Sequence, residues 1–183
     1  MTLISRLRRD DAVLLVVDVQ EKLVPAMFEA ERVVRGTSLL ARAAKLLDIP
    51  VVVTEQNPNR LGATVEPVVQ VLGSYAPVSK MRFSACVEET TTQLRATNRK
   101  SVILCGLEAH VCVLQSALDL VESDFTVFLP QDAVSSRYES DKRAGLERMK
   151  SAGAIPASVE MLIYELLGEA GTDEFRALLP FIK

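Results

Sequence analysis

Short β-branched runs alternate with longer segments of helical periodicity along the chain. The first run, Ala12–Val17 (AVLLVV), is continuously apolar, which is typical of a strand that is buried on both faces. Further strands are expected over residues 49–54, 76–79, 101–105, 125–129 and 154–155. Helices are expected over residues 31–48, 65–72, 88–98, 109–123, 140–151 and 159–167.

Breakers and capping residues set several boundaries in this pattern. Residues 55–63 contain Pro, Gly and two Asn, and we expect them to form a loop. Gly106 is expected to end the strand over 101–105, and Ser140 is expected to cap the helix that begins there.

The alternation of strands and helices predicts an α/β fold, because βαβ units with right-handed crossovers build a mostly parallel sheet with helices on both faces. We expect a doubly wound, three-layer α/β/α arrangement around a six-stranded sheet in the common order 3-2-1-4-5-6. No linker rich in Pro, Gly or Ser and no internal repeat interrupts the sequence. Residues 1–183 are therefore expected to form a single domain.

The composition is that of a globular protein, with 49% apolar and 25% charged residues, and it excludes a disordered or collagen-like chain. The formal net charge is −3, and aromatic residues make up only 5%, with no Trp. Such a chain has neither a basic field for a phosphate backbone nor aromatic platforms for stacked bases. We therefore expect a small-molecule substrate and no nucleic-acid partner.

The cysteine content favours a reducing compartment. The three cysteines, at positions 86, 105 and 112, form no CxxC pair, and a single histidine leaves too few ligands for zinc. A chain of this length needs no disulfide framework, so a cytoplasmic location is expected. The N-terminus lacks a signal-peptide pattern, and no apolar run approaches the roughly 20 residues that cross a bilayer, so no membrane association is expected.

Three reactive side chains follow three different strands. In open α/β sheets, ligands bind beyond the carboxyl ends of the strands, where the strand order reverses. Asp18 follows the first strand, Lys80 follows the third, and Cys112 lies in the first turn of the helix after the fourth. We expect the helix N-terminus and Lys80 to lower the pKa of the Cys112 thiol, and Asp18 to take its proton.

Each of these residues also has a purely structural interpretation. A cysteine near a helix start is often a small packed residue, Asp18 could cap a helix, and Lys80 could be a solvated surface charge. Their joint placement at strand ends favours the functional interpretation. Cys86 and Cys105 fit a packing role, and His110, two residues before Cys112, is expected to line the pocket or to cap the helix.

Several common active-site motifs are absent from the sequence. There is no GxGxxG after the first strand, which disfavours a dinucleotide site, and no GxxxxGK[ST], which excludes a P-loop NTPase. The GxSxG elbow of α/β-hydrolases is also missing. The candidate chemistry is therefore that of the thiol.

Five segments together carry a resemblance to a known family. They are VVDVQEKL (16–23), VVVTEQNPNRLGATV (51–65), SKMRFSAC (79–86), GLEAHVCVLQSALDL (106–120) and QDAVSSR (131–137). In this order, they resemble the isochorismatase-like cysteine hydrolases, a superfamily that includes nicotinamidases and N-carbamoylsarcosine amidase. The TEQNP loop and GLEAHVCV are most similar to the branch called isochorismatase domain-containing proteins.

The resemblance implies a catalytic triad on Asp18, Lys80 and Cys112. In the family, a thiolate attacks a carbonyl and forms a thioester, which water hydrolyses. The oxyanion hole would be formed by the backbone N–H groups of Glu108 and Cys112, and a cis peptide would join Leu107 to Glu108. Substrate contacts are expected from Gln20, Gln56, Phe83 and His110.

Two departures from the family narrow the expected reaction. Nicotinamidases carry an Asp-x-His-x-x-His metal site, whereas residues 55–59 of this chain contain no His, so neither a metal nor another cofactor is expected. Members that hydrolyse the vinyl ether of isochorismate generally lack the nucleophilic cysteine, which this chain keeps. We therefore expect a metal-free cysteine hydrolase that cleaves an amide or carbamoyl C–N bond.

Two alternatives and one assembly property remain open from the sequence. The chain could be a catalytically silent binding or scaffold member of the same fold. It could also hydrolyse a vinyl ether, with Asp18 as the acid. A homo-oligomer is expected, because residues 161–167 and 175–182 carry more apolar bulk than a lone edge helix needs and family members commonly assemble.

Overall fold

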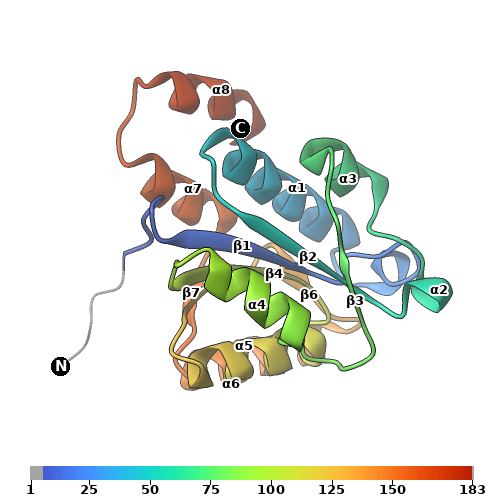
Figure 1. Ribbon diagram of the computed structural model, residues 1–183. Helices are drawn as coiled ribbons and strands as arrows, with labels where there is room; N and C mark the ends of the chain where they lie inside the picture. The colour runs from blue at the N-terminus through green and yellow to red at the C-terminus, as the bar shows by residue number, and fades with distance from the viewer. Residues whose placement is uncertain (1–5, 183) are drawn as a thin grey trace.

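The computed structural model of the chain describes residues 6–182. Strands and helices alternate along these residues, and Figure 1 labels most of them. The strands are β1 Ala12–Val17, β2 Val51–Gln56, β3 Val78–Lys80, β4 Ser101–Leu107, β5 Thr126–Pro130, β6 Val134–Ser135 and β7 Ile155–Ala157. The helices are η1 Val24–Ala26, α1 Ala30–Leu46, α2 Pro58–Leu61, α3 Glu66–Leu72, α4 Glu88–Ala96, α5 Cys112–Glu122, α6 Glu139–Ser151, α7 Val159–Leu167 and α8 Asp173–Ile182.

The strands form one parallel sheet between two layers of helices. The order is β3-β2-β1-β4-β5-β7, and β6 pairs with the end of β4. Helices α1, α3, α7 and α8 cover one face of the sheet, and α4, α5 and α6 cover the other (Figure 1). The α/β prediction and its strand order are confirmed, with β7 as the sixth strand in the expected series.

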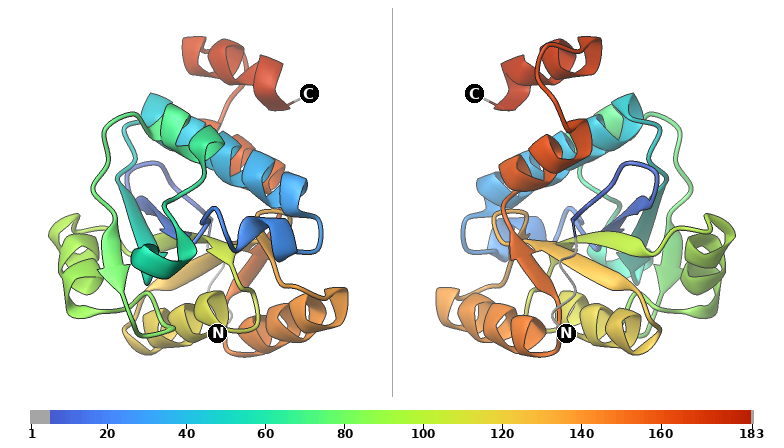
Figure 2. Two further views of the ribbon diagram at one scale, coloured as in Figure 1. Left: turned by 90° about the vertical axis from the view of Figure 1, so that its right-hand side faces the viewer. Right: turned by 90° about the vertical axis from the view of Figure 1, so that its left-hand side faces the viewer.

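Four local predictions were wrong. Residues 55–63 are not a continuous loop, because β2 extends to Gln56 and the short helix α2 follows. Strand β4 does not end before Gly106 but continues to Leu107. The two-residue strand β6 and the helix α8 were not expected at all. Figure 2 shows that α8 lies outside α1 and α7, on the side away from the sheet.

The predicted cap of α6 was also wrong. The helix begins at Glu139, with Tyr138 at the N-cap position, and no side chain donates or accepts a capping hydrogen bond there. A side-chain cap does occur at α7, where Ser158 Oγ accepts a hydrogen bond from the backbone N–H of Met161. Acidic residues in the first turn of α6 interact favourably with its helix dipole instead.

Strand β1 lies at the centre of the core. All of its residues are buried, and its neighbours are β2 on one side and β4 on the other. Two apolar clusters, one on each face of the sheet, take alternate residues of this strand. This two-sided burial explains the continuous apolar run in the sequence. It also fixes the end of β1, where Asp18 follows in a left-handed conformation with φ 54°.

Gly106 permits β4 to pass close to the end of β1. Its φ is +121°, and a Cβ atom built there would lie 2.0 Å from the carbonyl oxygen of Val17. A side chain at this position would therefore push β4 away from the strand that presents Asp18. The glycine that was expected to end the strand instead permits the close approach of two strands.

We expect Gly106→Ala to lower the free energy of unfolding by about 1–3 kcal/mol through overpacking, with a further cost from the strained φ. Gly168→Ala is the matched control, because Gly168 also has a positive φ, +74°, but nothing lies within 4 Å of its Cβ position. Urea unfolding followed by circular dichroism measures both. Equal losses in the two variants would contradict the close approach.

No helix among residues 6–182 is long and apolar enough to cross a membrane. The longest described helix, α1, has seventeen residues and a mixed face of charged and apolar side chains.

Candidate active site

Three side chains from different elements meet at the carboxyl edge of the sheet. Asp18 follows β1, Lys80 is the last residue of β3, and Cys112 is the first residue of α5. Lys80 Nζ lies 2.6 Å from Asp18 Oδ2, and both side chains are fully shielded from solvent. The Cys112 thiol hydrogen-bonds the Asp18 carboxylate and is only 6% exposed. The structure thus brings together the three residues singled out in the sequence.

The Asp18 carboxylate sits between three partners. Thr54 Oγ1 donates a hydrogen bond to Oδ1 at 2.8 Å, Lys80 donates to Oδ2, and the Cys112 thiol is the third partner. Burial raises the pKa of Asp18 above its ordinary value, while the charge of Lys80 and the hydrogen bonds lower it. The carboxylate therefore depends on the ammonium next to it to remain ionised.

The Lys80 ammonium is held by oxygen atoms on several sides. In addition to Asp18, it donates to Gln56 Oε1 at 2.9 Å and to the carbonyl oxygens of Arg82 and Phe83 at 3.2 and 3.0 Å. These contacts fix the position of the charge beneath the site. The possibility that Lys80 is a solvated surface charge is excluded, because the side chain is buried.

The Cys112 thiol is protonated at neutral pH. Burial and the negative charge of Asp18 raise its pKa to about 12, although Lys80 and the backbone N–H of Glu108 act in the opposite direction. The expectation that the helix N-terminus and Lys80 lower this pKa overall was wrong, because burial outweighs them. A base must therefore remove the proton when the sulfur reacts, and the Asp18 carboxylate is within hydrogen-bond reach.

Backbone groups next to the thiol point toward the sulfur. The peptide bond between Leu107 and Glu108 is cis, as the resemblance implied, and the N–H of Glu108 hydrogen-bonds Cys112. The carbonyl oxygen of Glu108 accepts the N–H groups of Val111 and Val113, which holds this turn in place. The arrangement offers a backbone N–H to a negatively charged oxygen formed near the sulfur.

The four expected substrate contacts have different surroundings. Gln56 bonds Lys80 with its oxygen and the carbonyl oxygen of Met81 with its nitrogen. Gln20 is fully buried, and its amide bonds only backbone groups of Gln56 and Gly62. The Phe83 ring is 55% exposed.

His110 lies on the other side of Cys112 and forms a separate hydrogen-bonded group. Its Nδ1 is 2.8 Å from Ser136 Oγ, and its Nε2 is 3.9 Å from the Asp141 carboxylate. The ring is about 30% exposed.

Comparison with known proteins places this fold and site in a family. A sequence model of the Isochorismatase domain family matches residues 12–161. The chain belongs to the isochorismatase family.

Relatives of this isochorismatase-family chain match over nearly its whole length. The secreted isochorismatase effector Isc1 of Phytophthora sojae is 42% identical, covering 98% of this chain and 88% of that protein. Isochorismatase domain-containing protein 2A of Mus musculus is 35% identical over 98% and 86%. The solved structure of the MAR1 ribonuclease from Caenorhabditis elegans has a TM-score of 0.92 and 36% identity, covering 97% and 92%. The resemblance seen in the sequence is confirmed.

Sequence reasoning missed two residues of the site. Thr54 bonds Asp18, and Arg137 Nε lies 2.9 Å from the side chain of Glu108. Thr54 was the last residue of the expected second strand, so its polar side chain next to the site could have been noticed. Arg137 ends the QDAVSSR segment, but its partner is set by β6, which the sequence did not predict.

The other two cysteines pack away from this centre. Cys105 is fully buried, and burial raises its pKa to about 12, while that of Cys86 is raised to about 11. Their thiols donate weakly to the carbonyl oxygens of Leu15 and Ser116. Among residues 6–182, no group of three His, Cys, Asp or Glu side chains is placed to hold a metal ion.

Proposed function

We propose that this isochorismatase-family hydrolase is a metal-free cysteine hydrolase. It cleaves the C–N bond of a small amide or carbamoyl compound through a thioester on Cys112. The buried contact between Lys80, Asp18 and Cys112 carries the proposal, because it joins a nucleophile, a base and a fixed positive charge. The roles below are assigned to these residues on that basis.

In the first half of the reaction, the Asp18 carboxylate takes the thiol proton while the sulfur attacks the carbonyl carbon. The new S–C bond turns the carbonyl oxygen into an oxyanion, which the backbone N–H groups of Glu108 and Cys112 stabilise. Collapse of this species breaks the C–N bond, and Asp18 gives its proton to the departing nitrogen. Ammonia or an amine leaves, and the acyl group stays on sulfur.

In the second half, water attacks the thioester, and Asp18 takes a proton from that water. The S–C bond breaks, the sulfur recovers a proton from Asp18, and a carboxylic or carbamic acid leaves. Lys80 supports Asp18 in both halves, because an opposite charge at 2.6 Å favours the ionised carboxylate. The net reaction is the hydrolysis of one C–N bond by one water molecule.

Two other functions could use the same fold. A vinyl-ether hydrolase would use Asp18 as an acid, which its raised pKa favours, and would not need the thiol. A binding or scaffold protein would need neither group. The hydrogen bond between the thiol and Asp18 supports the cysteine mechanism, because only that mechanism uses it.

The proposed substrate contacts surround the buried charges. Gln56 and Phe83 contact Lys80 from one side, while His110 lies on the side of α5. We assign Gln20 a positioning role, since its buried amide holds the backbone of Gln56. The substrate itself would contact Gln56, the half-exposed Phe83 ring and His110.

The reaction also bears on where the chain works and how it assembles. A free thiol nucleophile requires a reducing compartment, so a cytoplasmic location is proposed. Family membership does not decide this, since the Phytophthora sojae relative is named a secreted effector. Homo-oligomer formation stays a prediction, with the exposed apolar residues Met161 and Tyr164 of α7 as its expected surface.

A panel of small amides, carbamoyl compounds and vinyl ethers tests the proposed function, with release of ammonia, amine or acid as the readout. A short RNA belongs in the panel, because the similar nematode structure is named a ribonuclease. We expect one amide or carbamoyl compound to be turned over, with an acyl group trapped on the peptide that contains Cys112 by acid quench and mass spectrometry. The Cys86 peptide is the internal control. Turnover without a Cys112 adduct in single-turnover quench, or turnover only of the ether or the RNA, would contradict the cysteine mechanism.

A further inference from the structure

A long groove lies between helices α1 and α3, away from the candidate active site. Its volume is about 1160 Å³, and residues from Ala30 to Leu46 of α1 line one side. At 1.5 Å per residue, this stretch of helix is about 24 Å long. Helix α5, which carries Cys112, packs on the opposite face of the sheet. The groove is therefore a separate feature of the fold.

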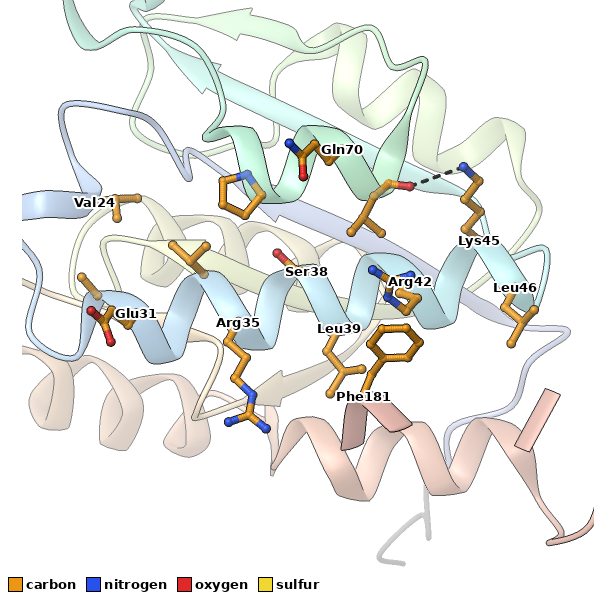
Figure 3. Close-up of a pocket in the computed structure, with 14 residues that line it drawn as sticks. Val24, Glu31, Arg35, Ser38, Leu39, Arg42, Lys45, Leu46, Gln70 and Phe181 are labelled. Atoms are coloured by element: carbon orange, nitrogen blue, oxygen red, sulfur yellow. Dashed lines mark hydrogen bonds between the residues drawn. The ribbon is translucent and has the colours of Figure 1, made fainter. Parts of the chain in front are cut away.

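The groove has apolar walls and a positively charged end. Val24 and Val34 line it together with Pro67 and Val71, and the Phe181 ring of α8 closes one side (Figure 3). Its ionisable lining residues are three cations and one carboxylate, namely Arg35, Arg42, Lys45 and Glu31. The whole chain has a net charge of −3, so this local excess of positive charge runs against the overall balance.

Arg42 and Lys45 lie one turn apart at the charged end. The guanidinium of Arg42 stacks on the Phe181 ring at 3.9 Å from its centre, and Lys45 reaches the carbonyl oxygen of Val71 at 3.5 Å. No carboxylate of residues 6–182 lies within ion-pairing distance of either cation. Both charges are therefore available to an anion that enters the groove.

Ser38 adds a second observation at the middle of the groove. Its hydroxyl is buried, and it has no hydrogen-bond partner among the residues that the structure describes. Figure 3 places Ser38 on the side of α1 that faces α3, between the apolar walls and the Arg42 end. A buried hydroxyl without a partner is unfavourable, so this group also points to a bound polar atom.

We propose that the groove binds a single-chain amphipathic anion, such as a medium-chain fatty acid. The carboxylate would lie between Arg42 and Lys45, within the reach of charge-assisted hydrogen bonds, and the acyl chain would run past Val34 and Val71. Apolar walls with a few convergent polar groups are typical of small-molecule sites. This binding site is independent of the thiol chemistry proposed above.

Isothermal titration calorimetry of the full chain with monomeric decanoate tests the site. We expect decanoate to bind at least about tenfold more tightly than decanol, which has the same chain without the charge, and decyltrimethylammonium to bind more weakly still. Arg42→Glu is expected to weaken decanoate binding at least about tenfold. Arg95→Glu, on the exposed surface of α4 behind the sheet, is the matched control and should change it less than about twofold.

Further arms keep the outcome decisive. Lys45→Glu repeats the test if Arg42→Glu lowers the unfolding temperature, because Lys45 is exposed and has no packing role against Phe181. The proposal is overturned if decanoate and decanol bind alike, or if phosphatidylglycerol vesicles bind while monomeric decanoate does not. It is also overturned if Arg42→Glu converts an oligomer into monomers in light scattering, because a second copy would then occupy the groove.

Discussion

An Asp18→Asn variant is expected to turn over its substrate about 10²–10⁴-fold more slowly than the unmodified chain, which is the usual effect of a lost general base. The amide keeps the shape and the hydrogen bond from Thr54, but it cannot accept the thiol proton. A Cys112→Ala variant sets the floor for comparison. Asp18→Asn should approach that floor, because a thiol with a pKa of about 12 is almost entirely protonated at pH 7.

Alkylation by iodoacetamide measures the same effect without a known substrate. In the unmodified chain, Cys112 is expected to react faster than Cys86 or Cys105 near pH 7, because Asp18 assists loss of its proton. Asp18→Asn should slow the reaction of Cys112 and leave that of Cys86 unchanged. Mass spectrometry of the separate cysteine peptides gives both rates from one sample.

The pH dependence of alkylation provides the sign. Burial raises the pKa of Asp18 above 3.8, so the reaction of Cys112 should fall as the pH drops through that raised value and the base is lost. In Asp18→Asn this acid limb should disappear, and the rate should instead rise steadily with pH as the thiolate fraction grows. An unchanged acid limb in Asp18→Asn would contradict the assignment of Asp18 as the base.

The second large effect is expected on stability. Lys80→Met should lower the free energy of unfolding by about 3–5 kcal/mol, the usual cost of leaving a buried charge without its partner. The Asp18 carboxylate would then keep only Thr54 and the thiol as partners. Met has a similar length and fits the apolar part of the space, so the loss would report the charge more than a cavity.

Two controls separate charge from packing in Lys80→Met. The double variant Asp18→Asn/Lys80→Met should recover a large part of the loss, because no unpaired charge remains. The loss should also be smaller at pH 5 than at pH 7. A carboxyl whose folded pKa lies above its unfolded value binds protons more readily in the native state, so stability rises as the pH falls. Equal losses at both pH values in urea unfolding would contradict this account.

Much of the fold was predictable because burial writes a strong pattern. The all-apolar run of β1 and the alternation of elements were sufficient for the sheet order and for the position of Asp18 and Lys80 at strand ends. Elements with weak patterns were not predictable. Strand β6 has only two residues, and α8 contains Pro180, which argues against a helix in a sequence.

The site was predictable in its membership but not in its electrostatics. Strand ends indicated which side chains would meet, whereas the pKa of Cys112 depends on how completely the thiol is buried, which no local pattern reveals. The same limit applies to Arg137, whose contact with Glu108 follows from the pairing of β6 with β4. Gly106 illustrates a further limit, since a rule for chain breakers cannot distinguish a strand end from a close crossing.

The surroundings of Lys80 carry a consequence for specificity. An ammonium group has three N–H bonds, and those of Lys80 are shared among oxygens of Asp18, Gln56, Arg82 and Phe83. In the proposed mechanism, no donor is left over to grasp an incoming molecule. Selectivity would then belong to the outer residues, which can diverge between relatives while the inherited chemical engine stays the same.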